Sequence, residues 1–177
     1  MPSSNKEGKG TIINWINERH QDIKRVLDLG PGIGTYSKFF RRKHRYLAHS
    51  HWIGIEVWKP YIAKYALKSL YHDIYNEDIR TFDYKKLRWI DCTFAGDVLE
   101  HITKEESIDV INKVFKISKI IIISIPIIYM PQKASENNPH EVHVKPDWSH
   151  TEVMDTFPHI RKWEDGKKIG VYWLEKQ

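Results

Sequence analysis

One short apolar run limits the folds open to this chain more than any other feature. Residues 119–126 read KIIIISIP, so isoleucine fills most positions of the run. Such a run is typical of a strand buried on both faces, and strands of this kind occur in parallel sheets with helices on both sides. The whole apolar stretch, Ile120 to Met130, is interrupted by Ser124 and Pro126. It is well short of the roughly 18 residues that a membrane span needs, so we predict a sheet protein and no membrane partner.

Strand-like and helical segments alternate along the chain. Strands are expected at Arg25–Leu29, His51–Glu56, near Ile74, Trp89–Ala95 and Lys119–Pro126. Helices are expected at Thr11–Arg19, from Thr35 to about Arg45, from Pro60 to about Leu70, from Thr103 and from Ser149. The last two begin with capping boxes, in which a hydroxyl and a Glu three residues later bond each other's backbone N–H groups. Two strand-like runs around a turn at residues 164–168 indicate an antiparallel hairpin. The pattern predicts a doubly wound α/β sheet with an antiparallel edge.

Length and composition favour one domain. A chain of 177 residues with 41% hydrophobic side chains is typical of a single domain, which we place at residues 11–177. Residues 1–10 are polar and rich in Gly and Ser, so we expect a disordered lead-in rather than a secretion signal. The single cysteine, Cys92, excludes an intramolecular disulfide and a multi-cysteine zinc site. It suits a reducing compartment, and we expect a cytoplasmic protein.

The charge balance is mildly basic. The formal net charge is +5, the sequence pI is about 9.1, and the densest cluster is RRKHR at Arg41 to Arg45. Basic residues at the end of a helix are favoured by the helix dipole and are usually solvated. A nucleic-acid partner is therefore an alternative and not the expectation.

The stretch VLDLGPGIGTYSKFF, from Val26 to Phe40, joins a strand to a helix through a glycine loop. Such a loop lets the backbone approach a ligand beside the helix N-terminus. A Walker loop would need Gly-Lys-Ser/Thr, which is absent, and Gly30, Gly32 and Gly34 are one residue short of the dinucleotide spacing G-x-G-x-x-G. Asp28, two places before the first glycine, would repel a pyrophosphate and attract an ammonium. S-adenosylmethionine (SAM) carries an ammonium and a sulfonium and no phosphate.

Four motifs between Val26 and Ile102 resemble those of the class I SAM-dependent methyltransferases, and the resemblance covers nearly the whole chain, from about Thr11 to Lys176. They are VLDLGPGIG, GIEVW, NEDI and FAGDVLEHI, in that order and at expected strand ends. The resemblance implies a Rossmann-like seven-stranded sheet in the order 3-2-1-4-5-7-6 with strand 7 antiparallel. It also implies that SAM is the cofactor.

The resemblance also implies roles for individual residues. The residues expected at the cofactor are Asp28, Gly30, Gly32 and Gly34 for the methionyl part, Glu56 for the ribose hydroxyls, Val57, Trp58, Asp78 and Ile79 for adenine, and Asp97 near the reacting methyl group. Plainer roles compete: Asp28 could cap the next helix, Trp58 could be a core residue, and Asp78 could close an Asx turn. Asp73 or Asp83 could also take the place of Asp78 in this loosely spaced motif.

The segment PQKASENNPHEVHVKPDWSH, residues 131–150, is expected to face the acceptor, since it follows the isoleucine strand at the ligand-binding edge. Tyr129 and Trp148 are expected to anchor it. A general base is needed only for a hydroxyl or a protonated amine, and the candidates are His101, His140 and His143; for His101 we favour a core histidine bonded to a carbonyl. No metal is expected, because His140 and His143 lack the HExxH spacing.

The expected function is methyl transfer to a small-molecule or saccharide-like acceptor, because no appended recognition region is evident. DNA-amino methylation is disfavoured, since Asp97-Val98-Leu99-Glu100 differs from Asn/Asp-Pro-Pro-Tyr/Phe, and Cys92 is upstream of the place that ring-carbon methylation would need. The alternatives are an RNA or protein methyltransferase that uses the basic helix face, and a SAM-binding regulatory module without turnover.

Overall fold

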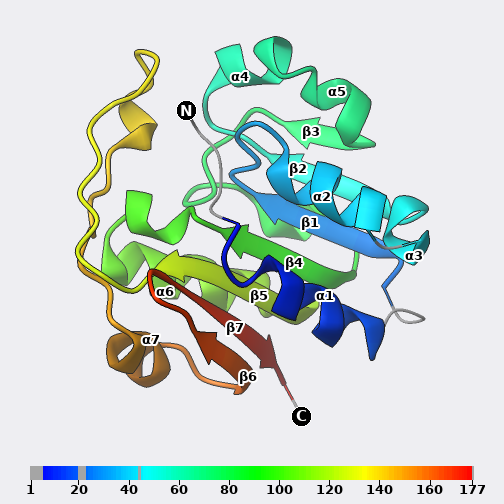
Figure 1. Cartoon of the computed structure of the whole chain (residues 1–177). Helices are drawn as coiled ribbons and strands as arrows, with labels where there is room; N and C mark the ends of the chain where they lie inside the picture. Colours follow the sequence, from blue (N-terminus) through cyan, green and yellow to red (C-terminus); the bar gives the residue numbers. More distant parts are fainter. Residues whose placement is uncertain (1–5, 20–22, 44, 177) are drawn as a thin grey trace.

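The computed structural model describes residues 6–19, 23–43 and 45–176, which form one sheet with helices on both faces (Figure 1). The seven strands lie in the order β3-β2-β1-β4-β5-β7-β6. Neighbouring strands are parallel from β3 to β5, and β7 is antiparallel to both β5 and β6. This confirms the predicted fold class and strand order.

The element bounds follow the sequence pattern closely. The strands are β1 Arg25–Leu29, β2 His51–Ile55, β3 Asp73–Tyr75, β4 Ile90–Gly96, β5 Ser118–Pro126, β6 Ile160–Asp165 and β7 Ile169–Glu175. The α-helices are α1 Lys9–Asn17, α2 Thr35–Lys43, α3 Arg45–Ala48, α4 Lys59–Lys64, α5 Leu67–Leu70, α6 Lys104–Val114 and α7 His150–Thr156. Short 3-10 turns are η2 Tyr84–Lys86, η3 Leu99–His101 and η4 Pro139–Glu141.

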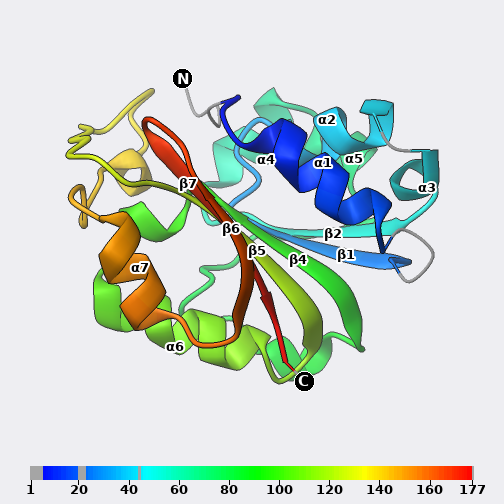
Figure 2. The same cartoon turned by 60° about the horizontal axis from the view of Figure 1, so that its bottom comes forward.

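The isoleucine run lies in the middle of the sheet and divides its side chains between two cores. Ile121, Ile123 and Ile125 pack in the core on the side of α6 and α7, whereas Ile120 and Ile122 pack on the side of α1 and α2. The division arises because successive strand residues point to opposite faces. Figure 2 shows α1 to α5 on one side of the sheet and α6 and α7 on the other.

Several helix expectations need correction. The first helix begins at Lys9, not Thr11, so the end of the expected lead-in is part of the fold, while residues 1–5 lie outside the described residues. The helix expected from Pro60 to Leu70 is two helices, because Ala66 adopts a left-handed φ of 51° between them. The helix expected from Thr35 to about Arg45 ends at Lys43.

The two predicted capping boxes differ. At Thr103 both hydrogen bonds form, with Glu106 as the partner. At Ser149 the hydroxyl accepts from the Glu152 backbone N–H, but the Glu152 carboxylate binds Lys104 and Lys145 instead. The second box is therefore only half formed, since two lysines offer the carboxylate a stronger partner than a backbone N–H.

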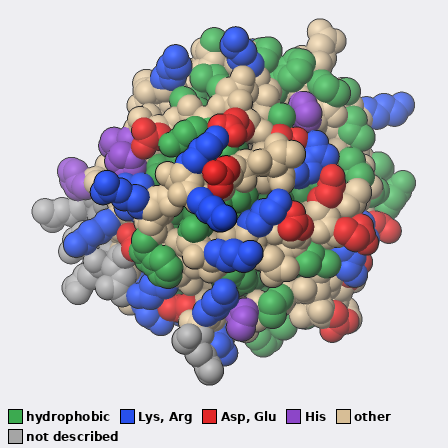
Figure 3. Space-filling view, turned by 180° about the vertical axis from the view of Figure 1, so that it is seen from behind, with side chains coloured by type: hydrophobic (Ala, Val, Ile, Leu, Met, Phe, Trp, Pro, Cys, Tyr) green, Lys and Arg blue, Asp and Glu red, His purple; other side chains and the backbone are tan. Residues whose placement is uncertain are grey.

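Charged groups of both signs are mixed on one face of the molecule. Figure 3 shows Lys and Arg side chains interspersed with Asp and Glu on the face opposite to that of Figure 1. In the expected basic cluster, Arg41 is half-buried, with its guanidinium 5.6 Å from the centre of the Trp52 ring. No helix among the described residues combines the length and the apolar character needed to cross a bilayer.

Candidate active site

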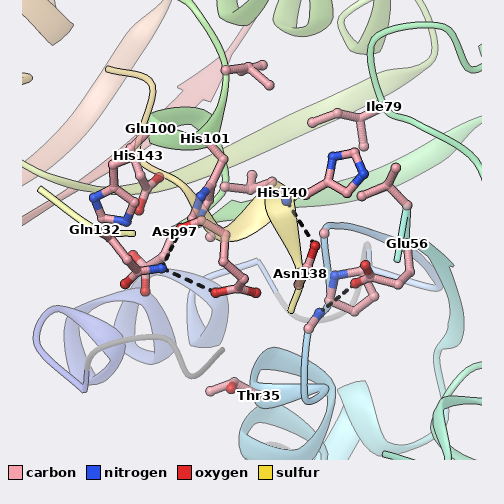
Figure 4. A pocket seen from close by; sticks show the side chains of 18 of the residues that line it. Thr35, Glu56, Ile79, Asp97, Glu100, His101, Gln132, Asn138, His140 and His143 are labelled. Carbon is pink, nitrogen blue, oxygen red and sulfur yellow. Dashed lines mark hydrogen bonds between the residues drawn. The ribbon is translucent and has the colours of Figure 1, made fainter. Parts of the chain in front are cut away.

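A cavity of about 530 Å³ lies at the carboxyl ends of β1, β2 and β4. Strand order reverses between β1 and β4, and open α/β sheets bind ligands at such a reversal. The predicted residues that line the cavity are Gly30, Gly32, Glu56, Val57, Asp78, Ile79, Asp97, His101, His140 and His143, and Figure 4 labels several of them. Asp28, Gly34 and Trp58 are not in its wall.

The glycine loop combines ligand space with tight packing. Gly30, Gly32 and Gly34 all have positive φ, at 61°, 54° and 75°, a region that other residues enter at a cost. A Cβ on Gly34 would lie 2.6 Å from Leu70 Cδ1. Gly34 therefore seats the loop against α5, while the first two glycines present their backbone to the cavity.

Glu56 links the end of β2 to the glycine loop. Its side-chain Oε2 accepts from the Gly32 N–H at 3.0 Å, and Oε1 accepts from the Trp58 N–H at 2.8 Å. Burial raises the pKa of Glu56, and the bonds from Trp58 and Gly32 partly offset this. Each carboxylate oxygen has two acceptor sites, so each keeps one for a ligand.

Asp28 lies behind the loop, away from the cavity wall. Its Oδ2 accepts from the Tyr71 hydroxyl at 2.5 Å, and the residue is only 1% exposed. Burial raises the pKa of Asp28 to about 7, although the Tyr71 bond lowers it. Asp28 thus joins β1 to the segment before β3, and its expected interaction with a ligand ammonium, directly or through water, stays a prediction.

Lys9 is a charged residue that sequence reasoning missed. Its side chain is buried, with the ammonium 4.7 Å from the centre of the Tyr36 ring, and it interacts electrostatically with Asp97 and Asp28. Burial lowers the pKa of Lys9 despite these two carboxylates. Its place in a polar, Gly-rich stretch gave no sign of burial.

Asp97 ends β4 in a strained backbone conformation. It has a φ of 52°, its N–H donates to the Ser124 carbonyl at 2.7 Å, and its Oδ1 accepts from the Ser124 hydroxyl at 3.0 Å. Non-glycine residues rarely adopt this φ, and such strain is concentrated at functional sites. The neighbouring strand β5 thus holds the Asp97 side chain at the cavity.

Asp78 closes an Asx turn and also lines the cavity. It accepts from the Arg80 N–H at 2.9 Å and from the Arg80 guanidinium at 2.6 to 3.0 Å. Burial would raise the pKa of Asp78, but Arg80 outweighs it and the pKa is lowered. Of the expected substitutes, Asp73 pairs with His51 and Asp83 caps η2, and neither lines the cavity.

Two histidines from distant parts of the chain, His101 and His143, meet on one wall of the cavity. His101 is in η3, and His143 lies in the loop before α7. Their rings pack edge to face with centres 4.8 Å apart. His101 Nδ1 lies 3.1 Å from the Val142 carbonyl, as expected for a structurally held histidine, yet the ring also borders the cavity. Burial, reinforced by His143, lowers the pKa of His101 to about 4, and burial also lowers the pKa of His143.

Glu100 stands beside these histidines and was not among the predicted site residues. It is 2% exposed and lines the cavity. Burial raises the pKa of Glu100 well above its usual range, and the charge of Asp97 adds to this rise. Its position in the LEHI motif next to His101 was the available signal.

Part of the segment 131–150 lines the cavity. The lining residues are Gln132, Asn138, His140, Glu141 and His143, whereas Trp148 is 1% exposed and packs in the core with Phe157. Trp148 therefore anchors the end of the segment in the core and is not in the cavity wall. Tyr129 is 72% exposed and outside the cavity wall.

A search with models of protein families and a search of curated proteins each found no match. Solved structures do match. The N-terminal domain of EvdMO1 with SAH bound is 11% identical with a TM-score of 0.69, over 98% of this chain and 83% of that one. A SAM-dependent methyltransferase from Clostridium acetobutylicum ATCC 824 is 11% identical with a TM-score of 0.67, over 94% and 89%. OxaC in complex with SAH and oxaline is 12% identical with a TM-score of 0.69, over 90% of this chain and 45% of its own. The chain has the fold of the class I SAM-dependent methyltransferases.

Proposed function

We propose that the chain is a methyltransferase that binds SAM in this cavity and methylates a small-molecule acceptor. The observation that carries the proposal is the contact between Glu56 and the Gly32 N–H at the point where strand order reverses. It fixes a carboxylate and an open glycine backbone side by side, as a ligand with a ribose and an amino-acid tail requires. The cavity volume of about 530 Å³ is within the range of small-molecule sites.

The residues present fit SAM. Gly30 and Gly32 offer backbone to its methionyl part, and Glu56 keeps acceptor sites for both ribose hydroxyls. Val57, Asp78 and Ile79 border the place expected for adenine, although Arg80 already binds the Asp78 carboxylate. The sulfonium supplies an activated methyl group. The chain itself therefore has to hold the acceptor in line with the methyl carbon and exclude water.

Asp97, His101 and His143 form the side of the cavity that we assign to the acceptor, whereas the His140 ring lies beside Trp58, with ring centres 6.1 Å apart. A small acceptor suits a cavity of this volume, and the OxaC structure is a complex with SAH and oxaline. The basic residues of α2 are in its last turn, whereas Thr35, at its start, lines the cavity. A nucleic-acid or protein acceptor bound to those basic residues would thus approach at the far end of the helix.

Thermal melting with separate ligands tests the cofactor assignment. SAM should raise the melting temperature and NAD at the same concentration should not, because a ligand that binds only the native state stabilises it. Stabilisation by NAD alone would reject the proposal. Incubation with SAM and pooled metabolites should then form S-adenosylhomocysteine, whereas binding without turnover in every pool would favour a regulatory SAM-binding module.

A further inference from the structure

Three side chains of metal-binding type meet on one wall of the cavity. Glu100, His101 and His143 each place one ligand atom within 4.8 Å of the others. Glu100 and His101 come from η3, directly after β4, and His143 comes from the loop that crosses the cavity (Figure 4). The cluster therefore depends on the tertiary fold, which explains why spacing along the sequence did not indicate it.

Both imidazoles are held in the orientation that a metal ligand needs. His101 Nδ1 lies 3.1 Å from the Val142 carbonyl, and His143 Nδ1 lies 2.5 Å from the Met130 carbonyl. A carbonyl oxygen only accepts hydrogen bonds, so in each neutral ring Nδ1 carries the proton and Nε2 keeps its lone pair. Histidine ligands of metals are usually oriented by such a bond from the other ring nitrogen.

The side chain of Glu100 provides a second, independent observation that points to a cation. Glu100 is 2% exposed, and its Oε2 accepts no hydrogen bond from the described residues. A buried carboxylate oxygen without a donor is costly unless a cation compensates it. The neighbouring histidines offer lone pairs to a cation rather than protons to Glu100, because their Nδ1 protons already bind carbonyls.

We infer that Glu100, His101 and His143 bind one divalent transition-metal ion on the wall of the cavity. Two imidazole nitrogens and one carboxylate suit Mn²⁺, Fe²⁺, Co²⁺ or Zn²⁺, whereas Mg²⁺ and Ca²⁺ prefer oxygen ligands alone. Three protein ligands leave at least one coordination position for another molecule. That position faces the cavity, because all three residues line it.

Together with the proposed methyltransferase function, on which this step rests, the metal site specifies the acceptor atom. A cation at this wall lowers the pKa of a coordinated hydroxyl, so the acceptor class is an alcohol, phenol or sugar hydroxyl. The hydroxyl loses its proton to solvent, and its oxygen lone pair forms the new bond to the methyl carbon. The bond from sulfur to that carbon breaks with its electron pair remaining on sulfur, which leaves S-adenosylhomocysteine.

The metal site is tested without SAM. The full chain, stripped with a chelator and desalted, is titrated with Co²⁺ while its visible absorption is recorded, and equilibrium dialysis counts bound ions. We expect saturation at one ion per chain and no competition from equimolar Mg²⁺. Glu100→Gln and His143→Ala should each weaken Co²⁺ binding by more than about tenfold, in line with the effects of disturbing metal sites. His140→Ala is the matched control, since His140 lines the same cavity outside the cluster, and it should keep the parent affinity.

Circular dichroism shows whether each variant folds. If Glu100→Gln fails to fold, the half-buried His143→Ala decides the result. Absence of saturable binding, or equal loss in His140→Ala and His143→Ala, would overturn the metal site.

SAM titration separates this proposal from the proposed function. His143→Ala should bind SAM within about twofold of the parent, because His143 is on the wall opposite Glu56. Metal binding without SAM binding would reject the methyltransferase function but support the metal site. SAM binding without metal binding would reject the metal site alone. If the chain binds both SAM and the metal, a chelator should abolish methylation of hydroxyl acceptors, and added Mn²⁺ or Co²⁺ should restore it. Turnover that resists the chelator, or methylation of amines alone, would reject the assignment of a hydroxyl acceptor.

Discussion

Removing the Glu56 carboxylate should weaken SAM binding more than it disturbs the fold. Glu56 follows β2 and receives two backbone N–H bonds, from Gly32 at 3.0 Å and from Trp58 at 2.8 Å. In Glu56→Ala both donors lose their acceptor, and SAM loses the group that we assign to its ribose. In Glu56→Gln one amide oxygen still accepts, so this variant should be intermediate.

The magnitude comes from the bonds that disappear. A hydrogen bond to a charged group contributes about 1.5–3 kcal/mol, and each 1.4 kcal/mol is a factor of ten in affinity. Glu56→Ala should therefore bind SAM about tenfold to a hundredfold more weakly. Leaving the Gly32 N–H without an acceptor should also lower the free energy of unfolding by about 1–3 kcal/mol.

Calorimetric titration of SAM into the parent and both variants measures the effect, with circular dichroism to confirm folding. Asp73→Ala is the control, because Asp73 is an exposed carboxylate on β3 that pairs with His51 outside the cavity. Its SAM affinity should equal that of the parent. If folded Glu56→Ala binds SAM as tightly as the parent, our placement of the ribose beside the ends of β1 and β2 is wrong.

Three further substitutions test the structure. Trp148→Ala should lower the free energy of unfolding by about 3–5 kcal/mol in urea titration, as loss of a buried aromatic side chain does. A variant with unchanged stability and impaired turnover would show instead that Trp148 acts on the acceptor. Gly34→Ala should lower the melting temperature, because φ is 75° and the new Cβ would lie 2.6 Å from Leu70; an unchanged value would contradict the packing. Asp28 has a pKa raised to about 7 by burial, so its protonated form stabilises the native state below about pH 4 and this contribution is lost as pH rises towards 7. Asp28→Asn should remove this fall in the free energy of unfolding between about pH 4 and pH 7, measured in a pH series of urea titrations. The exposed control Asp155→Asn should retain the fall.

The main-chain framework was predictable because it depends on local pattern. Arg25–Leu29 is a strand with the predicted bounds, and the Thr103 capping box forms as expected. Both rest on residues close in sequence: an apolar run for the strand and a hydroxyl three places before a Glu for the helix. The break at Ala66 had no such signal, because alanine is the strongest helix former and only the surrounding packing imposes its left-handed φ.

The side-chain partners were harder to predict because they lie far apart in the chain. Asp28 occupies the expected place on β1, but its bond to Tyr71 spans 43 positions. Trp148 is in a Pro-rich segment typical of a surface loop, yet its ring reaches Phe157 in the core. Strand ends therefore predicted which edge holds the site, and long-range contacts decided which side chains face it.

The sheet topology explains why the cavity has two chemically different walls. The strands β1 and β2 are on one side of the order reversal and supply open glycine backbone and Glu56, whereas β4 on the other side leads into Asp97, Glu100 and His101. Residues 130–143 reach both walls: His143 lies on the second, whereas Glu136 pairs with Lys64 of α4 and the His140 ring lies 6.1 Å from the Trp58 ring beside the first. Glu56 and His143 nevertheless have separate partners, because Glu56 accepts from the Gly32 and Trp58 N–H groups and His143 bonds the Met130 carbonyl. Effects on SAM affinity and on metal affinity should therefore separate between Glu56 and His143, and a joint loss in either variant would mean that the loop of residues 130–143 couples the two walls.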